Sequence, residues 1–417
     1  MWVRNRFLRV FLLVSVLLAA SAAQGSVVYT VVDNSYTSGS MGMVRMDASG
    51  APGLPEKDVV TNLGGDHSVY AFRDWAGRLR VLLAQHNFFG QHPDTVWIYD
   101  ARGDFRAPLK ETVWNEFKNS RGVASLGRYL YVTGYNGTEV CKVDGGSNYE
   151  MLRSFSFNAT AGYDAHGEGI VREGDHLFAI FSEEKGDYPN YDYISSKLVK
   201  LNPELEKIGI AELGKNPSSV KAHGGMIYVV SIGGSQQGGG FNPDSVIQRV
   251  DPDTMEVETL LRAGDLGVGW EYDFRDIAFG RDGAVYILAG AYNANWSKFN
   301  SRIFVTTLQG LEEGDKGVEY ADTTGPGVPW SIEYDGPDDI LWCAAGDRLK
   351  AFRGAESWEF GPGSLGGNFY SFAVVDAPAN PAPGDGGGGG CNSAGFSAIF
   401  LVALLPLLRV ASGKKRS

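Results

Sequence analysis

A three-residue segment recurs seven times along the middle of the chain and limits the folds that the chain can adopt. Each copy joins a polar or aromatic residue, a small residue and an apolar residue, and successive copies lie about 40 to 57 residues apart. A repeat of this length indicates one structural unit packed against copies of itself. The seven copies, which we call the triplets, are His67-Ser68-Val69, Arg121-Gly122-Val123, Glu168-Gly169-Ile170, Ser218-Ser219-Val220, Arg275-Asp276-Ile277, Trp330-Ser331-Ile332 and Tyr370-Ser371-Phe372.

Each unit also contains runs of β-branched and aromatic residues. A third run in most units ends in Asp or Asn, as in Val96–Asp100 and Val246–Asp251, and a weaker fourth run follows it. Four short strands in about 50 residues, repeated seven times, predict an all-β fold, a seven-bladed β-propeller. The strongest runs are Val27–Val32, Leu79–Ala84, Tyr129–Thr133, His176–Phe181, Met226–Ser231, Ala284–Ala289 and Ile340–Ala344.

The first and last strands complement each other. The N-terminal unit lacks a first strand, whereas Phe369–Val375 follows the last complete unit without companions. We therefore expect Phe369–Val375 to complete the blade begun by Val27–Val32, so that the C-terminal strand closes the first blade and residues 24–376 form one propeller. In this strand pattern the chain resembles seven-bladed propellers of the NHL and YVTN type. A two-domain β-sandwich is the alternative fold.

The composition excludes several other classes of protein. The 417 residues are 43% hydrophobic, carry a net charge of −12 and include three cysteines. The hydrophobic content excludes wholesale disorder, and three cysteines cannot make a disulfide-dense scaffold. The acidic balance argues against a surface that coats nucleic acid, so we expect no nucleic-acid partner.

Residues 1–23 have the order of a secretory signal peptide. Arg4, Arg6 and Arg9 precede the apolar run Val10–Ala20, and small residues follow as far as Ala23. We expect cleavage after Ala23 and export of the remaining chain. An uncleaved N-terminal membrane anchor is the alternative.

The C-terminal end has three parts. A Pro- and Gly-rich linker at 377–390 leads to the segment 391–417, which starts at Cys391, continues with the apolar stretch Phe396–Leu408 and ends in the basic cluster Lys414–Arg416. This order resembles the bacterial sorting domains of the GlyGly-CTERM and Synerg-CTERM kind. The resemblance implies contact with the membrane, a processing protease, and Cys391 as the candidate for cleavage or lipid attachment. The protein would then lie in the cell envelope or on the outer surface, anchored or released after processing. A GPI signal and a plain tail anchor are the alternatives.

The predicted loops between second and third strands, among them Ser182–Ser196 and Gly290–Ser301, are long and mix aromatic residues with Asn, Gln, Asp and Gly. In a propeller blade these loops share one face with the approaches to the first strands. Flat apolar rings beside amide groups suit a polysaccharide, peptide or protein ligand. Alternatively, the loops only cover the end of the propeller, and their aromatic residues are packing. The candidate ligand-binding residues in these loops are Phe88, Tyr191, Phe241, Tyr292 and Trp296.

The first two triplet positions are expected to ring the mouth of the central channel. Acidic and basic groups that converge there could bind a polar ligand or transfer protons. An alternative is a ring of ion pairs that closes the channel, for example Arg275 with Glu168. The candidates are His67, Arg121, His166, Glu168, Arg275, Asp276 and Trp330.

The sequence does not assemble a recognised catalytic or metal-binding motif. Propeller lactonases, to which the predicted fold is similar, hold a divalent metal with Glu, Asp and Asn. Of the triplet residues, only Glu168 and Asp276 stand at fitting positions, and Ca²⁺ prefers six to eight oxygen ligands. We therefore expect no metal or other cofactor, with a divalent cation at these two residues as the alternative.

Taken together, these features predict an exported, envelope-anchored propeller that binds a ligand through its long-loop face without catalysis. A lactonase-like hydrolase or lyase at the channel mouth is the first alternative, with Glu168, Asp276, His67 or His166 as its acid–base groups. A structural envelope protein that packs against other subunits is the second.

Overall fold

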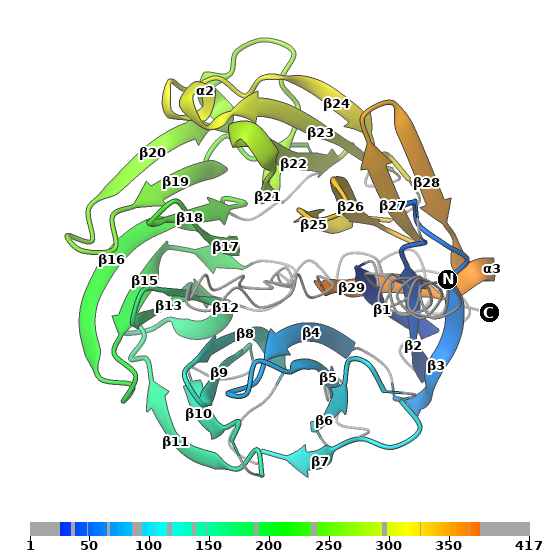
Figure 1. Cartoon of the computed structure of the whole chain (residues 1–417). Helices are drawn as coiled ribbons and strands as arrows, with labels where there is room; N and C mark the ends of the chain where they lie inside the picture. Colours follow the sequence, from blue (N-terminus) through cyan, green and yellow to red (C-terminus); the bar gives the residue numbers. More distant parts are fainter. Residues whose placement is uncertain are drawn as a thin grey trace, which may run out of the picture.

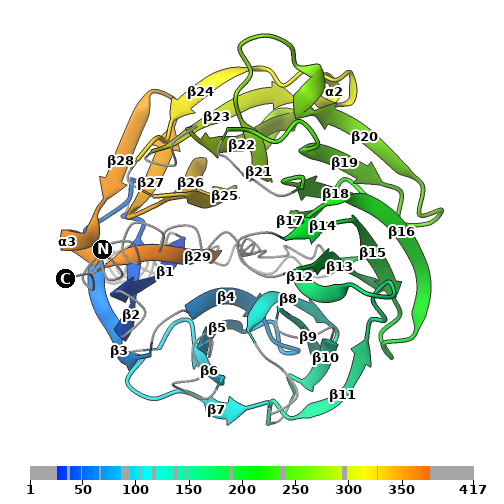
Figure 2. The same ribbon diagram turned by 180° about the vertical axis from the view of Figure 1, so that it is seen from behind.

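The computed structural model describes residues 26–375 except 35–37, 48, 65–66, 86–93, 104, 115–118, 136–138, 147, 187–190, 235–239, 294–297, 326 and 366. Its strands form seven antiparallel sheets around a central axis (Figure 1), and the view from behind shows the same ring (Figure 2). The predicted seven-bladed β-propeller is therefore confirmed, and the β-sandwich alternative is wrong.

The blades are numbered from the N-terminus, with strands given from the centre outward. Blade 1 consists of β29 (Asn368–Val375), β1 (Val27–Asn34), β2 (Ser38–Arg45) and β3 (Glu56–Leu63). Blade 2 consists of β4 (His67–Arg73), β5 (Leu79–Gln85), β6 (Thr95–Asp100) and β7 (Lys110–Val113). Blade 3 consists of β8 (Ser120–Leu126), β9 (Tyr129–Gly134), β10 (Glu139–Asp144) and β11 (Met151–Ser156).

Blade 4 carries an additional short strand, β14 (Asp192–Tyr193), which pairs with β13. Its main strands are β12 (Asp164–Glu173), β13 (His176–Lys185), β15 (Ser195–Leu201) and β16 (Lys207–Lys215). Blade 5 consists of β17 (Pro217–His223), β18 (Met226–Ser231), β19 (Val246–Val250) and β20 (Val257–Arg262). Blade 6 consists of β21 (Asp273–Phe279), β22 (Ala284–Tyr292), β23 (Phe299–Thr307) and β24 (Val318–Asp322). Blade 7 consists of β25 (Pro329–Asp335), β26 (Ile340–Ala345), β27 (Arg348–Arg353) and β28 (Glu356–Phe360).

The described helices are short. They are α2 (Leu308–Glu312) and α3 (Pro362–Leu365), with single 3-10 turns at Ala263–Asp265 and Arg281–Gly283. None of the described helices is long and apolar enough to cross a lipid bilayer.

The C-terminal strand closes the ring as expected. β29 pairs with β1 in antiparallel register, with Val375 opposite Val27. The hydroxyl of Ser26 also donates a hydrogen bond of 2.9 Å to Oδ1 of Asp335 in blade 7. Both ends of the described chain are thus held in the ring where blades 1 and 7 meet.

The third triplet residue builds the core between blades. Seven clusters of buried side chains fill the seven interfaces, and each cluster contains one third triplet residue. Burial of one large apolar side chain contributes about 1.5–3 kcal/mol, so this position explains why the repeat is visible in the sequence. The seven residues are Val69, Val123, Ile170, Val220, Ile277, Ile332 and Phe372.

The second triplet residue is small because neighbouring inner strands approach closely there. A Cβ on Gly122 of β8 would lie 2.7 Å from the backbone nitrogen of Ile170 in β12. A Cβ on Gly169 of β12 would lie 3.1 Å from Val220 in β17. In blade 1, Ser371 occupies this position, and its hydroxyl accepts a hydrogen bond of 3.3 Å from the backbone N–H of Val69 in blade 2.

The two ends of the propeller differ in their connections. His67 at the start of β4 lies opposite Gln85 at the end of β5, so the triplets share one end with the loops between second and third strands. We call this end the triplet face. The opposite end, where Arg73 pairs with Leu79, carries the turns between first and second and between third and fourth strands. We call it the turn face.

Several loops predicted from the sequence are shorter in the structure. In the predicted loop Ser182–Ser196, β13 continues to Lys185 and β14 adds a further pair. In the predicted loop Gly290–Ser301, β22 continues to Tyr292 and β23 begins at Phe299. The strands extend because cross-strand pairing compensates for the weak strand propensity of glycine, serine and charged residues.

Candidate functional site

The inner strands of six blades are irregular at the first triplet position. The pairing register with the second strand shifts there, whereas β4 of blade 2 pairs regularly from His67 onward. A bulge interrupts the alternation of side chains and gives the extra residue its own direction. The extra residues are Arg121, Glu168, Ser218, Arg275, Trp330 and Tyr370.

Three planar side chains stack where blades 3 and 4 meet on the triplet face. The guanidinium carbon of Arg121 lies 4.7 Å from the centre of the Tyr135 ring. The rings of Tyr135 and His166 are nearly parallel, with centres 4.4 Å apart. Stacking of this kind holds an arginine in one orientation while leaving the edge of its guanidinium able to donate hydrogen bonds.

Glu168 lies on the neighbouring bulge and is almost fully buried. Its Oε1 accepts a hydrogen bond of 2.9 Å from the hydroxyl of Ser182. Its Oε2 is also buried and has no hydrogen-bond partner in the part of the chain that the structure describes. Burial raises the pKa of Glu168 to about 7, against the opposing effect of the nearby Arg121 and His166. Both its protonated and its ionised form are therefore populated near neutral pH.

His166 is held between two acceptors. Its Nδ1 donates a hydrogen bond of 2.6 Å to the carbonyl oxygen of Tyr135, and its Nε2 lies 3.2 Å from Oε1 of Glu184. Burial acts to lower the pKa of His166, but the hydrogen bond and the charge of Glu184 outweigh burial and raise it. The imidazolium form is thus favoured. We call these side chains the Glu168 cluster: Arg121, Tyr135, His166, Glu168, Ser182 and Glu184.

Blade 4 extends further on the triplet face than its neighbours. β12 and β13 have ten residues each, and β12 begins four residues before Glu168. β14 pairs with the end of β13 and sets Tyr193 opposite Glu184. Tyr191 is partly exposed, and its ring centre lies 6.2 Å from that of Tyr193. The structure therefore brings Tyr191, a predicted loop residue, close to the Glu168 cluster.

Arg275 and Asp276 serve the joints between blades 5, 6 and 7. The ion pair recorded for Arg275 is with Asp273 on its own strand, at 3.1 Å, and not with Glu168. The oxygens of Asp276 accept hydrogen bonds from the hydroxyl of Ser219 in blade 5 (2.5 Å) and from the backbone nitrogen of Ile332 in blade 7 (2.9 Å). Both residues are buried. The carboxylate of Asp276 joins blades 5, 6 and 7. The side chain of Arg275 bonds within blade 6, and its carbonyl oxygen accepts a hydrogen bond of 2.8 Å from the hydroxyl of Ser218 in blade 5.

The other predicted residues lie on other blades or outside the described residues. His67 is buried on blade 2, and Trp330 is partly exposed on blade 7. Phe241 packs against the core between blades 5 and 6, and Tyr292 lies in β22, where its ring meets that of Phe299 edge-on. The predicted Phe88 and Trp296, and the predicted processing sites Ala23 and Cys391, lie outside the described residues.

Sequence reasoning missed several residues at this face. Tyr135 directly follows β9, and Glu184 lies in a part of β13 that we had predicted as loop. Asn119 and Asn216 each precede a first triplet residue by two positions and adopt left-handed backbone, with φ of 57° and 52°. Both are buried, and their Oδ1 atoms have no hydrogen-bond partner among the described residues. An Asn at a fixed offset before the triplet is the signal that could have revealed them.

The described residues contain no group of three or more His, Cys, Asp or Glu side chains placed to hold a metal ion. Glu168 and Asp276, the two residues considered for a cation, belong to blades 4 and 6. Both carboxylate oxygens of Asp276 accept the hydrogen bonds given above.

Neither a protein-family model nor a curated protein matches the chain. The solved structures that resemble it include a protein from Bacteroides fragilis assigned provisionally as a 6-phosphogluconolactonase, at 12% identity over 85% of this chain and 98% of that one, with a TM-score of 0.54. They also include apo AztD from Citrobacter koseri, at 12% identity over 86% of this chain and 100% of that one, with a TM-score of 0.44. The similarity to the Bacteroides fragilis structure establishes a shared fold alone, and that fold is the β-propeller.

Proposed function

We propose that this protein is an exported, envelope-anchored propeller that binds a carbohydrate-class ligand on its triplet face, centred on the Glu168 cluster. The observation that carries the proposal is the meeting of Arg121, His166, Glu168 and Glu184, all buried or nearly so, at one junction between blades. Buried ionisable groups are unfavourable unless they are paired or used, and they gather at functional sites.

The chemistry of the cluster supports a polyhydroxylated ligand. The guanidinium of Arg121 carries N–H donors, whereas Glu184 and the oxygen of Glu168 that has no partner among the described residues are acceptors. Both N–H groups of His166 already bond Tyr135 and Glu184, so His166 holds Glu184 in place. Opposite charges nearly balance, which favours hydroxyl groups over a strongly charged ligand. Tyr191 supplies a partly exposed ring nearby, and sugars stack on such rings.

The test is binding of the purified protein to a glycan array, followed by calorimetry with the glycans that bind. Glu168→Gln and Glu184→Gln should each weaken binding at least about tenfold, since loss of a charged hydrogen-bond partner in a buried site costs about 1.5–3 kcal/mol. The matched control is Glu183→Gln, the neighbouring residue on β13, whose Oε1 accepts a hydrogen bond from Thr160. Equal binding by all three variants would refute the proposal.

A hydrolase or lyase is the second candidate, and it is favoured by one specific observation. Burial raises the pKa of Glu168 to about 7, the range suited to a general acid or base at neutral pH. A panel of lactones, esters and uronic-acid polysaccharides tests this candidate. Turnover that follows a pH profile with a midpoint near 7 and is lost in Glu168→Gln would support catalysis over binding alone.

A further inference from the structure

We propose that the turn face of blades 1 and 2 docks on an anionic lipid surface. This surface lies at the opposite end of the propeller from the Glu168 cluster, so the proposal is independent of the ligand proposed there.

The chain leaves the propeller on this face. Val375 ends β29 opposite Val27, which is the position held by the turn Arg73–Leu79 in blade 2. Residues 376–417 continue from this point and include the segment 391–417 that the sequence predicts to enter a membrane. A tail that starts on the turn face of blade 1 brings that face, and that of the adjoining blade 2, nearest to the bilayer.

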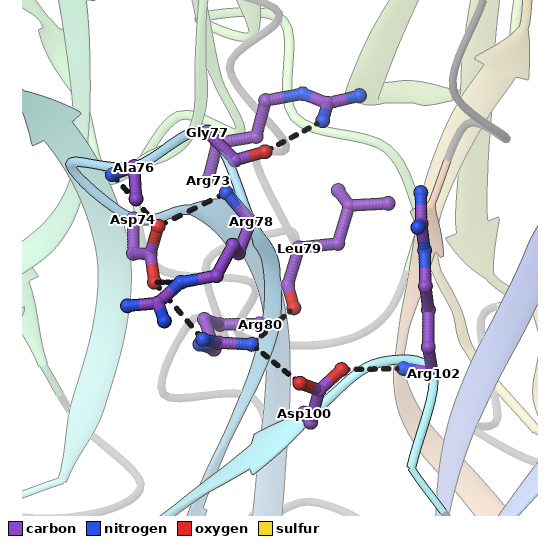
Figure 3. A network of polar contacts seen from close by, with 9 residues as sticks. All are labelled: Arg73, Asp74, Ala76, Gly77, Arg78, Leu79, Arg80, Asp100 and Arg102. Carbon is purple, nitrogen blue, oxygen red and sulfur yellow. Dashed lines mark hydrogen bonds and ion pairs between the residues drawn. The ribbon is translucent and has the colours of Figure 1, made fainter.

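Blade 2 presents exposed arginines beside this exit. Arg73 and Arg78 flank the turn between β4 and β5, and Arg102 and Arg106 follow β6. Figure 3 shows Arg73, Arg78 and Arg102 around one turn-face network. The side chain of Arg102 has no ion-pair partner among the described residues, and the side chain of Arg73 bonds a turn carbonyl, that of Gly77, at 3.1 Å.

The described acidic groups of these two turns are already neutralised. Asp74 forms ion pairs with Arg78 at 2.8 Å and with Arg80 at 3.1 Å, and Asp100 forms an ion pair with Arg80 at 2.8 Å (Figure 3). The arginines at these two turns, counting Arg80, thus number five against two described aspartates. Asp104 lies outside the described residues, and one further carboxylate would still leave the net charge of the two turns positive. On a chain with a net charge of −12, this local positive charge marks one part of the turn face that an anionic surface attracts.

Exposed apolar side chains accompany the arginines. Trp75 is 56% exposed at the tip of the turn between β4 and β5, Leu109 is 54% exposed before β7, and Leu54 is 92% exposed before β3 of blade 1. Tryptophan with basic neighbours is the composition of an interfacial membrane contact, in which the ring enters the headgroup region and the arginines pair with phosphates.

The turn face of blades 4 and 5 has the opposite character. Its exposed charged residues are mainly acidic and include Asp175, Glu204, Glu206, Asp253 and Glu256. An anionic surface repels this side and attracts blade 2. This charge distribution favours an orientation with blade 2, and with it the adjoining blade 1, against the lipid.

The experiment is hydrogen–deuterium exchange on the full chain in nanodiscs of phosphatidylcholine, with and without about a third of phosphatidylglycerol. We expect amides of residues 73–80 and 101–110 to be better protected in the anionic discs. Amides of residues 173–176 and 202–206 on blade 4 should exchange equally in both. Equal protection in the two lipids, or failure of the full chain to associate with discs, would overturn the proposal.

A matched pair of variants separates docking from a general charge effect. Arg73→Glu with Arg102→Glu should abolish the lipid-dependent protection while leaving the thermal unfolding unchanged, because both side chains are exposed. The control, Arg172→Glu with Arg281→Glu, makes the same change of charge at turn-face arginines of blades 4 and 6, which also bond turn carbonyls. Loss of protection in the control as well would argue against a specific surface.

Discussion

Glu168 shows how the surroundings of one repeat position can change the ionisation of its side chain. It occupies the same bulge as Ser218 and Trp330, but it is buried beside Arg121 and His166 and keeps one oxygen without a described partner. At the equivalent place in blade 6, Arg275 pairs with Asp273, and Phe299 covers its guanidinium at 5.1 Å. The same backbone irregularity therefore carries an ion-paired arginine in one blade and a buried carboxyl with a raised pKa in another.

The raised pKa of Glu168 predicts a pH-dependent stability. Its pKa of about 7 in the folded protein exceeds the ordinary value of 4.5, so the folded state holds the proton more tightly than the unfolded state. Stability should fall as pH rises from about 4.5 to about 7, by on the order of 3 kcal/mol from this group. Urea unfolding at pH 5 and pH 8 should show Glu168→Gln gaining stability over the native protein at the higher pH. A pH-independent difference would contradict this.

At the scale of the element, polar side chains fix the turns that end the strands. In several blades the third strand ends with an Asp or Asn whose side-chain oxygen accepts a hydrogen bond from a backbone N–H of the following turn. Asp100 accepts from Arg102 at 2.9 Å, Asp144 from Gly146 at 2.8 Å and Asn202 from Glu204 at 2.9 Å. Such Asx turns explain why these residues recur in the sequence. In blade 2, Arg80 adds a buried link between two such carboxylates (Figure 3).

Removal of Arg80 should destabilise blade 2 strongly. The Arg80 side chain is 5% exposed, and Arg80→Met leaves the buried Asp74 with Arg78 as its one described ion-pair partner. We therefore expect a loss of about 3 kcal/mol in the free energy of unfolding. The Arg78 side chain is 57% exposed, and Arg78→Met should cost less than about 1 kcal/mol. Urea unfolding of the two variants measures both values. Similar losses would mean that burial does not set the strength of this network.

The close approach of the inner strands predicts that two Gly→Ala substitutions differ in their cost to stability. Gly122→Ala places a methyl group against the backbone of β12 and should cost about 1–3 kcal/mol as the strands move apart. Gly336→Ala, in a turn where a Cβ meets nothing within 4 Å, should change stability by no more than about 0.5 kcal/mol. Thermal unfolding of both proteins provides the measurement, and an equal cost would refute the packing argument.

For the whole molecule, closure of the ring depends on the last strand. Phe372 and Val374 of β29 belong to the core between blades 7 and 1, and Ala373 and Val375 belong to the core between blades 1 and 2. The proposed ligand surface and the proposed lipid surface lie at opposite ends of this ring. A ligand on the triplet face would therefore not compete with the bilayer.

Loss of β29 should prevent stable folding. A chain that ends at Gly367 lacks the inner strand of blade 1 and opens two of the seven cores, so we expect aggregation or a molten state. A chain that ends at Asp376 keeps β29 and should show cooperative unfolding. Near-ultraviolet circular dichroism and size-exclusion chromatography distinguish the two. A monomeric, cooperatively folded product ending at Gly367 would show that closure is dispensable.

The sequence alone determined the number of blades and the closing strand. These features follow from local patterns, because every unit repeats the same strand-forming runs, turn residues and apolar triplet position. Val69 and Ile277 are examples of that apolar position, and both are buried. The first triplet residues were also found from the sequence, as was their place at the inner strands. What the sequence left open was which of them would meet.

Only the tertiary structure decided the composition of the site. Arg121 and Glu168 come together, whereas Arg275 turns to Asp273, because a bulge frees the side-chain direction and contacts from the neighbouring blade then select it. Tyr135 and Glu184 joined the site through strand pairing and stacking between blades, which no local pattern encodes. Local alternation thus specifies each blade, and contacts between blades specify the chemistry at the mouth.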